Sequence, residues 1–299
     1  MKSLTKVMML LTALLCLTGC GPQNAASTPA ASTAAEPAEE PANTENDAPP
    51  DKIMVNDAMD NLQLTGPSTP VYDPYTLAER RAKGLTTALP AITPYKEGKV
   101  VYLTFDDGPD DTNTPAILDI LKEQQVQATF YVLGKHAELY PDMIRRMFDE
   151  HHAIGSHSYD HIYSRIYVSP ASYIAEMEKT DEILKSIIGM RPLITRAPGG
   201  TIGHFTEAYP PVLQANGYAE HDWNISSADA APNHPVAQDF IDNVLGQIDK
   251  PNAPCSAIIL MHCSEGHEET VKALPTIIQI LKEHGYTFGV ITPMTPSPW

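Results

Sequence analysis

From Lys99 onward the sequence alternates short apolar runs with longer amphipathic stretches, and this alternation restricts the fold more than any other feature. Runs such as KVVYLTF, ATFYVLG and SAIILMH have the length of β-strands, while stretches such as AILDILKEQ repeat their apolar residues at helical spacing. Strands that alternate with helices form parallel sheets, because each helix carries the chain back to begin the next strand. Seven such repeats in about 200 residues predict an α/β barrel.

Polar residues stand at the ends of these apolar runs, where a buried strand has no structural use for them. They are Asp106 and Asp107 after the first run, His157 and His161 after the third, Arg196 after the fourth, Asp222 in or just after the fifth, and His262 at the end of the sixth. In barrels of this kind the chemistry takes place at the carboxyl ends of the strands. We therefore expect these side chains to converge on one mouth of the fold.

Two of these residues, His157 and His161 in GSHSYDH, have a spacing that suits a metal ion. On one turn of helix, residues four apart lie on the same face, so both imidazoles can reach one ion. The spacing is not specific by itself, since His151 and His152 lie close by in the sequence. A carboxylate from a neighbouring strand end would complete a set of two histidines and one acid, which leaves a coordination position open for water and favours catalysis.

The net charge of −17 argues against a nucleic-acid partner, because phosphate binding needs a basic surface. The N-terminal MKSLTKVMMLLTALLCLTGC has basic residues followed by an apolar stretch, residues 7–17, that is too short to span a bilayer and has the proportions of a secretory signal. Its end, LTGC, resembles a bacterial lipobox, which implies that Cys20 becomes a lipid-modified N-terminus outside the cytoplasm. The alternative is an ordinary signal peptide that happens to contain a cysteine.

The composition changes twice between this signal and the barrel. Residues 21–61 are rich in Ala, Pro, Ser, Thr and acidic residues, which predicts a disordered linker, and residues 62–98 form an extension whose packing the sequence leaves open. The catalytic domain is expected at 99–299. Cys255 and Cys263 bracket one predicted strand about 26 Å long, so we expect no disulfide between them.

The segments TFDDGP, HSYDH, RAPGG, DW and LMH occur in the order of five motifs of the NodB-homology polysaccharide deacetylases, and the chain resembles this family from about residue 99 to 293. The resemblance implies a distorted (β/α)7 barrel, one divalent metal ion, and removal of acetyl groups from acetylated sugars. Metal-affinity order favours zinc, with cobalt, nickel, manganese and iron as alternatives.

Carried over position by position, the resemblance assigns a role to each motif residue. It implies that Asp107, His157 and His161 hold the metal, and that Asp106 is the base that takes a proton from the attacking water. His262 would be the general acid, with Asp222 as the carboxylate that raises its basicity. Arg196 would orient the base, Gly199 would offer its N–H to the oxyanion, and Trp223 and Leu260 would line the acetyl pocket. A surface position for Arg196 and simple core packing for Leu260 are the alternatives.

Two positions depart from the family pattern. Many members have a bulky aromatic residue where Gly199 stands and an acid where Cys263 stands, so substrate preference is expected to differ. The remaining histidines have no motif support and are interpreted as surface or packing residues; they are His136, His204, His221, His234, His267 and His284.

The lipid anchor and spacer predict a protein tethered to the membrane and facing the cell wall. We expect it to be a monomer. The substrate expected there is an N-acetylated polysaccharide, with peptidoglycan amino sugars as the first choice. Chitin oligomers or poly-N-acetylglucosamine, and O-acetyl xylan, are alternatives. A cell-surface carbohydrate-binding lipoprotein without catalytic activity is the non-enzyme alternative.

Overall fold

Strand β3 and its partner β10 form the centre of a parallel sheet in the computed structural model, which describes residues 51–64, 66–94, 98–233, 235–250 and 254–298. The strand order is β8-β7-β5-β4-β3-β10-β9, with β11 also paired to β3. The strands are β3 (Val100–Asp106), β4 (Thr129–Val132), β5 (Ala153–Ser156), β7 (Ile194–Thr195), β8 (Ala219–Glu220), β9 (Ile225–Ser226), β10 (Ser256–His262) and β11 (Thr287–Gly289). All pairings between them are parallel, as the alternation of strands and helices predicts.

The predicted distorted barrel is confirmed, and two features of the sheet account for the distortion. On one edge of β3, residues 100–102 pair with β11 and residues 104–106 pair with β4, so β11 enters where β3 and β4 diverge. The second feature is that the single predicted run YAEHDWNI is split into two strands, β8 and β9, which lie at opposite ends of the strand order. Within the described residues these two strands do not pair with each other, so the sheet curls without closing by hydrogen bonds.

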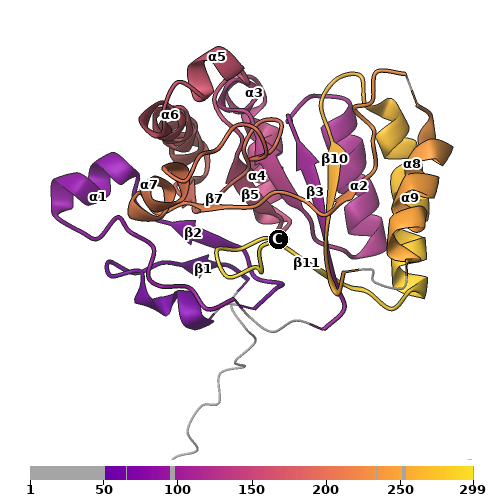
Figure 1. Ribbon diagram of the computed structural model, residues 1–299, viewed down its shortest axis with the longest axis horizontal. Coiled ribbons are helices and arrows are strands. Elements are labelled where there is room, and N and C mark those ends of the chain that lie inside the picture. The colour runs from indigo at the N-terminus through magenta and orange to yellow at the C-terminus, as the bar shows by residue number, and fades with distance from the viewer. Residues whose placement is uncertain (1–50, 65, 95–97, 234, 251–253, 299) are drawn as a thin grey trace, which may run out of the picture. The chain divides into compact units, whose positions relative to one another are not determined.

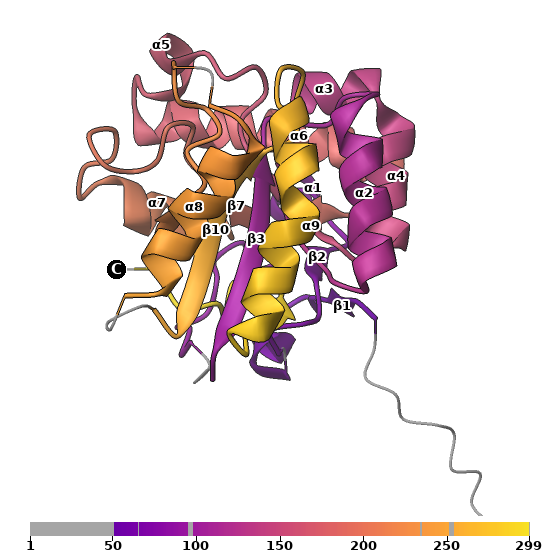
Figure 2. The same ribbon diagram turned by 90° about the vertical axis from the view of Figure 1, so that its right-hand side faces the viewer.

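Helices cover the outer face of this sheet, and Figure 2 shows α2, α8 and α9 in front of β3 and β10. The helices that follow the strands are α2 (Asn113–Gln124), α3 (Gly134–Leu139), α4 (Pro141–Asp149), α5 (Tyr163–Ile166), α6 (Pro170–Ile188), α7 (Tyr209–Ala215), α8 (Ala237–Ile248) and α9 (Glu268–Glu283). The longest, α6, begins where the Ser169 side chain accepts from the N–H of Ser172 and Pro170 occupies the first turn. It ends at Gly189, whose φ of 75° suits a glycine.

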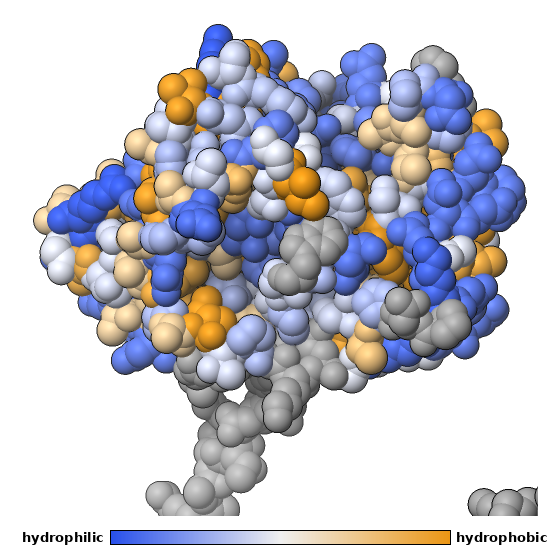
Figure 3. Space-filling view, viewed as in Figure 1, coloured by the Kyte–Doolittle hydropathy of each residue, from blue (hydrophilic) through white to orange (hydrophobic). Residues whose placement is uncertain are grey.

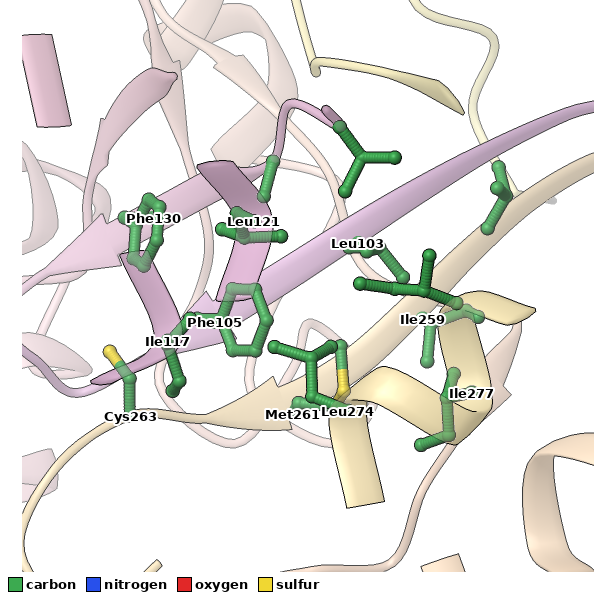
Figure 4. Packing of buried hydrophobic residues seen from close by; sticks show 14 of the residues in the cluster. Leu103, Phe105, Ile117, Leu121, Phe130, Ile259, Met261, Cys263, Leu274 and Ile277 are labelled. Atoms are coloured by element: carbon green, nitrogen blue, oxygen red, sulfur yellow. The ribbon is translucent and has the colours of Figure 1, made fainter. Parts of the chain in front are cut away.

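The two faces of the central strands have different surroundings. Val101, Leu103 and Phe105 point outward into the main core, where Figure 4 shows Phe105 beside Ile117 of α2 and Leu274 of α9. Burying each side chain of this kind stabilises the fold by about 1.5–3 kcal/mol. The alternate residues point inward, so Val100 and Tyr102 of β3 pack in a second cluster with residues from β4, β5, β7 and β10.

The inward column of β3 ends in polar residues, Thr104 and Asp106, both fully or almost fully buried. In the register of the sheet, Asp106 is paired with His262, the last residue of β10. Paired residues of a parallel sheet share a face, so both side chains lie at the inner edge of the carboxyl end. The fold therefore brings the ends of the first and sixth predicted strands together.

The segment before the barrel belongs to the same folded unit. Strand β1 (Ile53–Met54) pairs with β2 (Val71–Asp73), which pairs with β6 (Arg191–Pro192), while η1 (Asp60–Leu64) and α1 (Leu77–Lys83) lie between. The side chains of Val55 and Met59 are buried, so the prediction of a linker to residue 61 is wrong for residues 53–61, because these apolar side chains pack in a core. The predicted signal, Cys20 and linker residues 21–50 lie outside the described residues.

A buried ion-pair network ties the extension of residues 62–98 to the barrel. Asp73 is 2.6 Å from Arg80 and 2.9 Å from Arg191, and the side chains of all three are fully buried. Removing one partner of such a network leaves an uncompensated buried charge. The extension is therefore an integral part of the folded body.

The surface gives no sign of a membrane-spanning element in the part of the chain that is described. No helix there is both long and apolar enough to cross a bilayer. On the face shown in Figure 3, hydrophobic residues occur singly or in small groups among hydrophilic ones.

Candidate active site

The loop after β3 directs two consecutive aspartates to one mouth of the barrel. Adjacent residues of a strand point to opposite faces, so Asp107 can join Asp106 only because the chain leaves the strand there, with φ of 70° at Asp107. The backbone of Asp107 is fixed on both sides: its N–H donates to the carbonyl of Tyr131 at 3.2 Å, and its carbonyl lies 2.7 Å from Nδ1 of His136.

His157 and His161 come together through a loop, and the helical turn expected from their spacing is wrong. The segment between β5 and α5 bends at Ser158 and His161, both with positive φ, and the Ser158 side chain accepts from the N–H of His161 at 3.0 Å. The two imidazole ring centres are 5.3 Å apart. Tight loop geometry, rather than helical periodicity, therefore brings the two rings to one point.

These two histidines and Asp107 form a group with the character of a metal site. Oδ1 of Asp107 lies 3.5 Å from Nε2 of His157 and 3.6 Å from Nε2 of His161. This oxygen is buried and has no hydrogen-bond partner among the described residues, which is costly unless a cation or donor faces it. The residues present therefore fit a divalent ion.

The tautomer of His157 supports the same interpretation. Its Nδ1 lies 2.8 Å from the carbonyl of Arg196, an acceptor, which leaves the lone pair on Nε2. Burial lowers the pKa of His157 to about 3, although the nearby Asp107 opposes the shift. The imidazole is therefore neutral over the physiological range, the form that binds metals.

Asp106 lies beside this group and is held by Arg196. Its carboxylate is 2.9 Å from Nη1 of Arg196 and 3.8 Å from Nε2 of His157. Burial raises the pKa of Asp106, and the charge of Arg196 only partly offsets this. The guanidinium also donates to Thr104 at 2.6 Å, so the alternative of a surface arginine is wrong: Arg196 is fully buried.

His262 is paired with Asp229, and the prediction that Asp222 is its partner is wrong. Nδ1 of His262 lies 2.9 Å from Oδ1 of Asp229, whose other oxygen accepts from the backbone N–H of His262 and from Thr270. Burial works against a charged imidazole here, but the hydrogen bond and charge of Asp229 outweigh it and raise the pKa of His262 to about 9. The physical reason is position: Asp229 follows β9, which pairs with β10, whereas Asp222 precedes β9.

Asp222 instead holds the loop that carries Gly199. Its carboxylate accepts from the backbone N–H of Thr201 at 3.1 Å and from the Thr201 hydroxyl. Glu220 accepts from the N–H of Ala197 at 3.3 Å at the other end of the same loop. Two carboxylates therefore fix the segment from 197 to 201 in place.

Of the three residues expected around the acetyl group, Trp223 and Leu260 lie on the inner side of the barrel. Gly199 has φ of 75°, in the region that favours glycine. The Trp223 ring packs on the inner cluster and against Gly200, where an added Cβ would lie 3.0 Å from it. Leu260 is half-buried and is the inward residue below His262 on β10. Their roles toward substrate stay predictions.

Several residues around the site escaped the sequence analysis. Asp229 and Thr104 have no motif of their own, although an acid at the end of a strand-length run was a usable signal for Asp229. His136 supports the Asp107 loop, and the ring of His267 stacks on His262 at 5.0 Å. The sequence indicates only surface or packing roles for these two histidines.

The thiol of Cys263 is a packing group. It is fully buried, and a Cβ added at Gly108 would lie 2.4 Å from its sulfur. Burial raises the pKa of the Cys263 thiol well above its usual range, so it stays protonated. Cys255 and Cys263 flank opposite ends of β10, and both thiols are free.

Comparison with known proteins gives consistent matches. A family model described as polysaccharide deacetylase matches residues 94–220. A peptidoglycan-N-acetylglucosamine deacetylase of Bacillus cereus is 36% identical over 197 residues, which are 64% of this chain and 69% of that protein.

Solved structures agree with these sequence matches. The crystal structure of a polysaccharide deacetylase from Bacillus cereus matches with a TM-score of 0.59 at 35% identity, over 64% of this chain and 92% of that one. A CE4 esterase from Streptococcus mutans matches with a TM-score of 0.62 at 31% identity, over 71% and 94%.

Proposed function

Because the chain belongs to the polysaccharide deacetylase family, a family of hydrolases, we propose that it removes N-acetyl groups from the amino sugars of peptidoglycan. The observation that carries the proposal is the arrangement of Asp107, His157 and His161 around one point, with Asp106 beside them. The relatives named as peptidoglycan-N-acetylglucosamine deacetylases support the choice of polymer.

Asp107, His157 and His161 would hold one divalent ion, and zinc suits this mixed donor set. When bound, such an ion acidifies a water molecule and polarises the acetyl carbonyl. The protein contributes the geometry: His136 and the positive φ at Asp107 fix one ligand, and the carbonyl of Arg196 fixes the ring of His157.

Proton transfer is divided between the two sides of the mouth. Asp106, with its pKa raised by burial, accepts a proton from the attacking water as the new C–O bond forms. Arg196 holds one oxygen of Asp106 and so keeps the carboxylate oriented. His262, kept protonated by Asp229, donates a proton to the sugar nitrogen as the C–N bond breaks.

The loop held by Asp222 and Glu220 places the N–H of Gly199 for the oxyanion. Trp223 and Leu260, on the inner side of the barrel, would border the methyl group of the acetyl. A rigid loop is an advantage here, because an oxyanion donor is effective only if it needs no reorganisation during the reaction.

The sequence supports a place of action outside the cytoplasm. The lipobox-like LTGC supports a lipid on Cys20 and attachment outside the cytoplasm, facing the cell wall. Metabolic labelling with a palmitate analogue tests this: the wild-type chain incorporates label and Cys20→Ala does not.

Acetate release tests the proposed reaction. Protein loaded with zinc or cobalt is incubated with peptidoglycan and with N-acetylglucosamine oligomers. Mass spectrometry follows the loss of about 42 Da for each acetyl group that is replaced by hydrogen. We expect loss that a chelator abolishes. Release only from O-acetylated xylan would identify an esterase instead, and binding without release would identify a carbohydrate-binding protein.

A further inference from the structure

The space above Gly199 is filled by a side chain from elsewhere in the chain. A Cβ built on Gly199 would lie 2.3 Å from the hydroxyl oxygen of Tyr163 and 3.1 Å from its Cζ. Tyr163 begins α5, two residues after His161, the last residue of the HSYDH segment. The hydroxyl therefore lies directly over the loop whose N–H is placed for the oxyanion.

Tyr163 also lies against the metal-binding group. Its ring centre is 5.3 Å from that of His161. The edges of two further rings support it: the ring centres of His204 and Tyr167 lie 5.2 and 5.7 Å away, both nearly perpendicular to Tyr163. The phenol is therefore held in one orientation beside the site.

The hydroxyl of Tyr163 is not used by the protein. Among the described residues it has no hydrogen-bond partner, and 42% of the residue is exposed. The neighbouring Tyr167 differs, because its hydroxyl donates to the carbonyl of Pro198 at 2.6 Å and so supports the loop. A supported ring with a free hydroxyl is the arrangement expected of a ligand contact rather than a core residue.

Exposed apolar side chains occur next to Tyr163 in the chain and in the loop that carries Gly199. Ile162 is 38% exposed, and Ile202 is 80% exposed. A sugar ring offers both C–H groups and hydroxyls, so a tyrosine with one apolar face and one polar tip matches it well. Figure 1 shows α5 at the upper edge of the molecule, and α5 packs against α6.

We propose that Tyr163 binds the sugar whose acetyl group reacts, with its ring against the sugar and its hydroxyl donating to a sugar oxygen. The inference rests on the proposed deacetylase function and names a residue that decides which sugars fit. Because a side chain at residue 199 would clash with this hydroxyl, the glycine at 199 and the tyrosine at 163 act as a pair.

The test compares Tyr163→Phe with the wild type on two substrates. With an N-acetylglucosamine oligomer we expect KM to rise about threefold to tenfold with little change in kcat, the effect of one lost hydrogen bond in binding. With 4-nitrophenyl acetate, which carries no sugar, we expect rates within about twofold of the wild type. Tyr163→Ala, which also removes the ring, is expected to raise KM for the oligomer further.

Tyr75→Phe is the matched control, because Tyr75 lies in the N-terminal extension beside Arg80 and Lys83. Metal content is measured for every variant, and it should not change. An unchanged KM for the oligomer in Tyr163→Phe would overturn the proposal, and so would an equal loss on both substrates, which would indicate an effect through His161 or Gly199.

Calorimetric titration of the oligomer separates this inference from the proposed function. If the wild type released no acetate, the proposed function would fail. Weaker oligomer binding by Tyr163→Phe than by Tyr75→Phe would still support the sugar contact, and equal binding would overturn it.

Discussion

Two groups of one aspartate and two histidines lie at the mouth of the barrel, and they differ in how their polar atoms are used. In each group the potential ligand atoms lie within 4.8 Å of one another. In the first, Asp107 with His157 and His161, the shared carboxylate oxygen is buried without a hydrogen-bond partner. In the second, Asp229 with His262 and His267, both carboxylate oxygens accept hydrogen bonds, three in all.

This difference shows that residue type alone does not decide what a cluster does. A carboxylate with an unsatisfied buried oxygen gains from a cation, whereas one that is already saturated would have to give up hydrogen bonds to bind it. Asp229 uses its charge to raise the pKa of His262 to about 9, so His262 is a cation itself near neutral pH. The first group is therefore suited to a metal and the second to a proton.

The largest expected effect comes from breaking the first group. His157→Ala should lose the metal and lower kcat/KM by on the order of 1,000-fold, because the chemistry of the site depends on the bound ion. Elemental analysis of the purified protein, together with acetate release, measures both. His284→Ala, at a half-buried position beside Asp249, is the matched control. A His157→Ala protein with full metal content would refute the ligand assignment.

The second-largest effect is expected at Asp106, and it separates metal binding from proton transfer beside the first group. Asp106→Asn keeps the shape of the side chain and removes its basicity, so turnover should fall about 10²- to 10⁴-fold. The metal content should stay at the wild-type level, since the proposed ligand oxygen belongs to Asp107, which lies 3.5 and 3.6 Å from the two histidines. A rate close to that of the wild type would exclude Asp106 as the base.

The second group is tested by its pH dependence. His262 must be protonated to donate, so with a pKa of about 9 the donor is present at neutral pH and is lost as the pH rises through that value. In Asp229→Asn the charge of Asp229 is lost, burial still lowers the pKa of His262, and the charges of Asp106 and Asp107 still raise it, so we expect this pKa to return toward the ordinary value of about 6.5. The alkaline limb of the kcat profile should therefore move to lower pH. At pH 8 we expect kcat to be about 30-fold lower than in the wild type, because about that much less His262 is protonated.

A bound cation lowers the pKa of His262 in both proteins, so the displacement between their pH profiles is the quantity to measure. Identical profiles would mean that Asp229 does not control the general acid.

The smallest effect is expected for Asp222→Asn, which tests whether Asp229, rather than Asp222, is the carboxylate partner of His262. Asparagine retains one oxygen that can accept from Thr201, so the loop should be only partly loosened and kcat should fall less than about tenfold. The alkaline limb should stay where it is in the wild type. If Asp222→Asn displaced the pH profile as Asp229→Asn does, the pairing of His262 would have been assigned to the wrong carboxylate.

The parallel α/β barrel and the convergence of Asp106, Asp107, His157 and His262 could be predicted from the sequence, because strand-helix alternation sends every strand end to the same edge. Family motifs added roles that spacing could not. The partner of His262 could not be predicted, because the break of one apolar run into β8 and β9 depends on pairing with β7 and β10.

Backbone conformation and long-range packing explain the other differences. The loop that joins His157 to His161 depends on positive φ at residues that are not glycine, which no sequence pattern announces. The packing of residues 53–61 depends on tertiary contacts of Val55 and Met59 within a segment of polar composition. The position of Tyr163 over Gly199 is also a contact between distant loops.

The most direct test is a crystal structure of the zinc-loaded protein with anomalous diffraction recorded at the zinc edge. The account predicts one strong peak at ligand distance, about 2.0–2.2 Å, from a carboxylate oxygen of Asp107 and from Nε2 of His157 and His161. A peak between Asp229, His262 and His267, with none at Asp107, would contradict it.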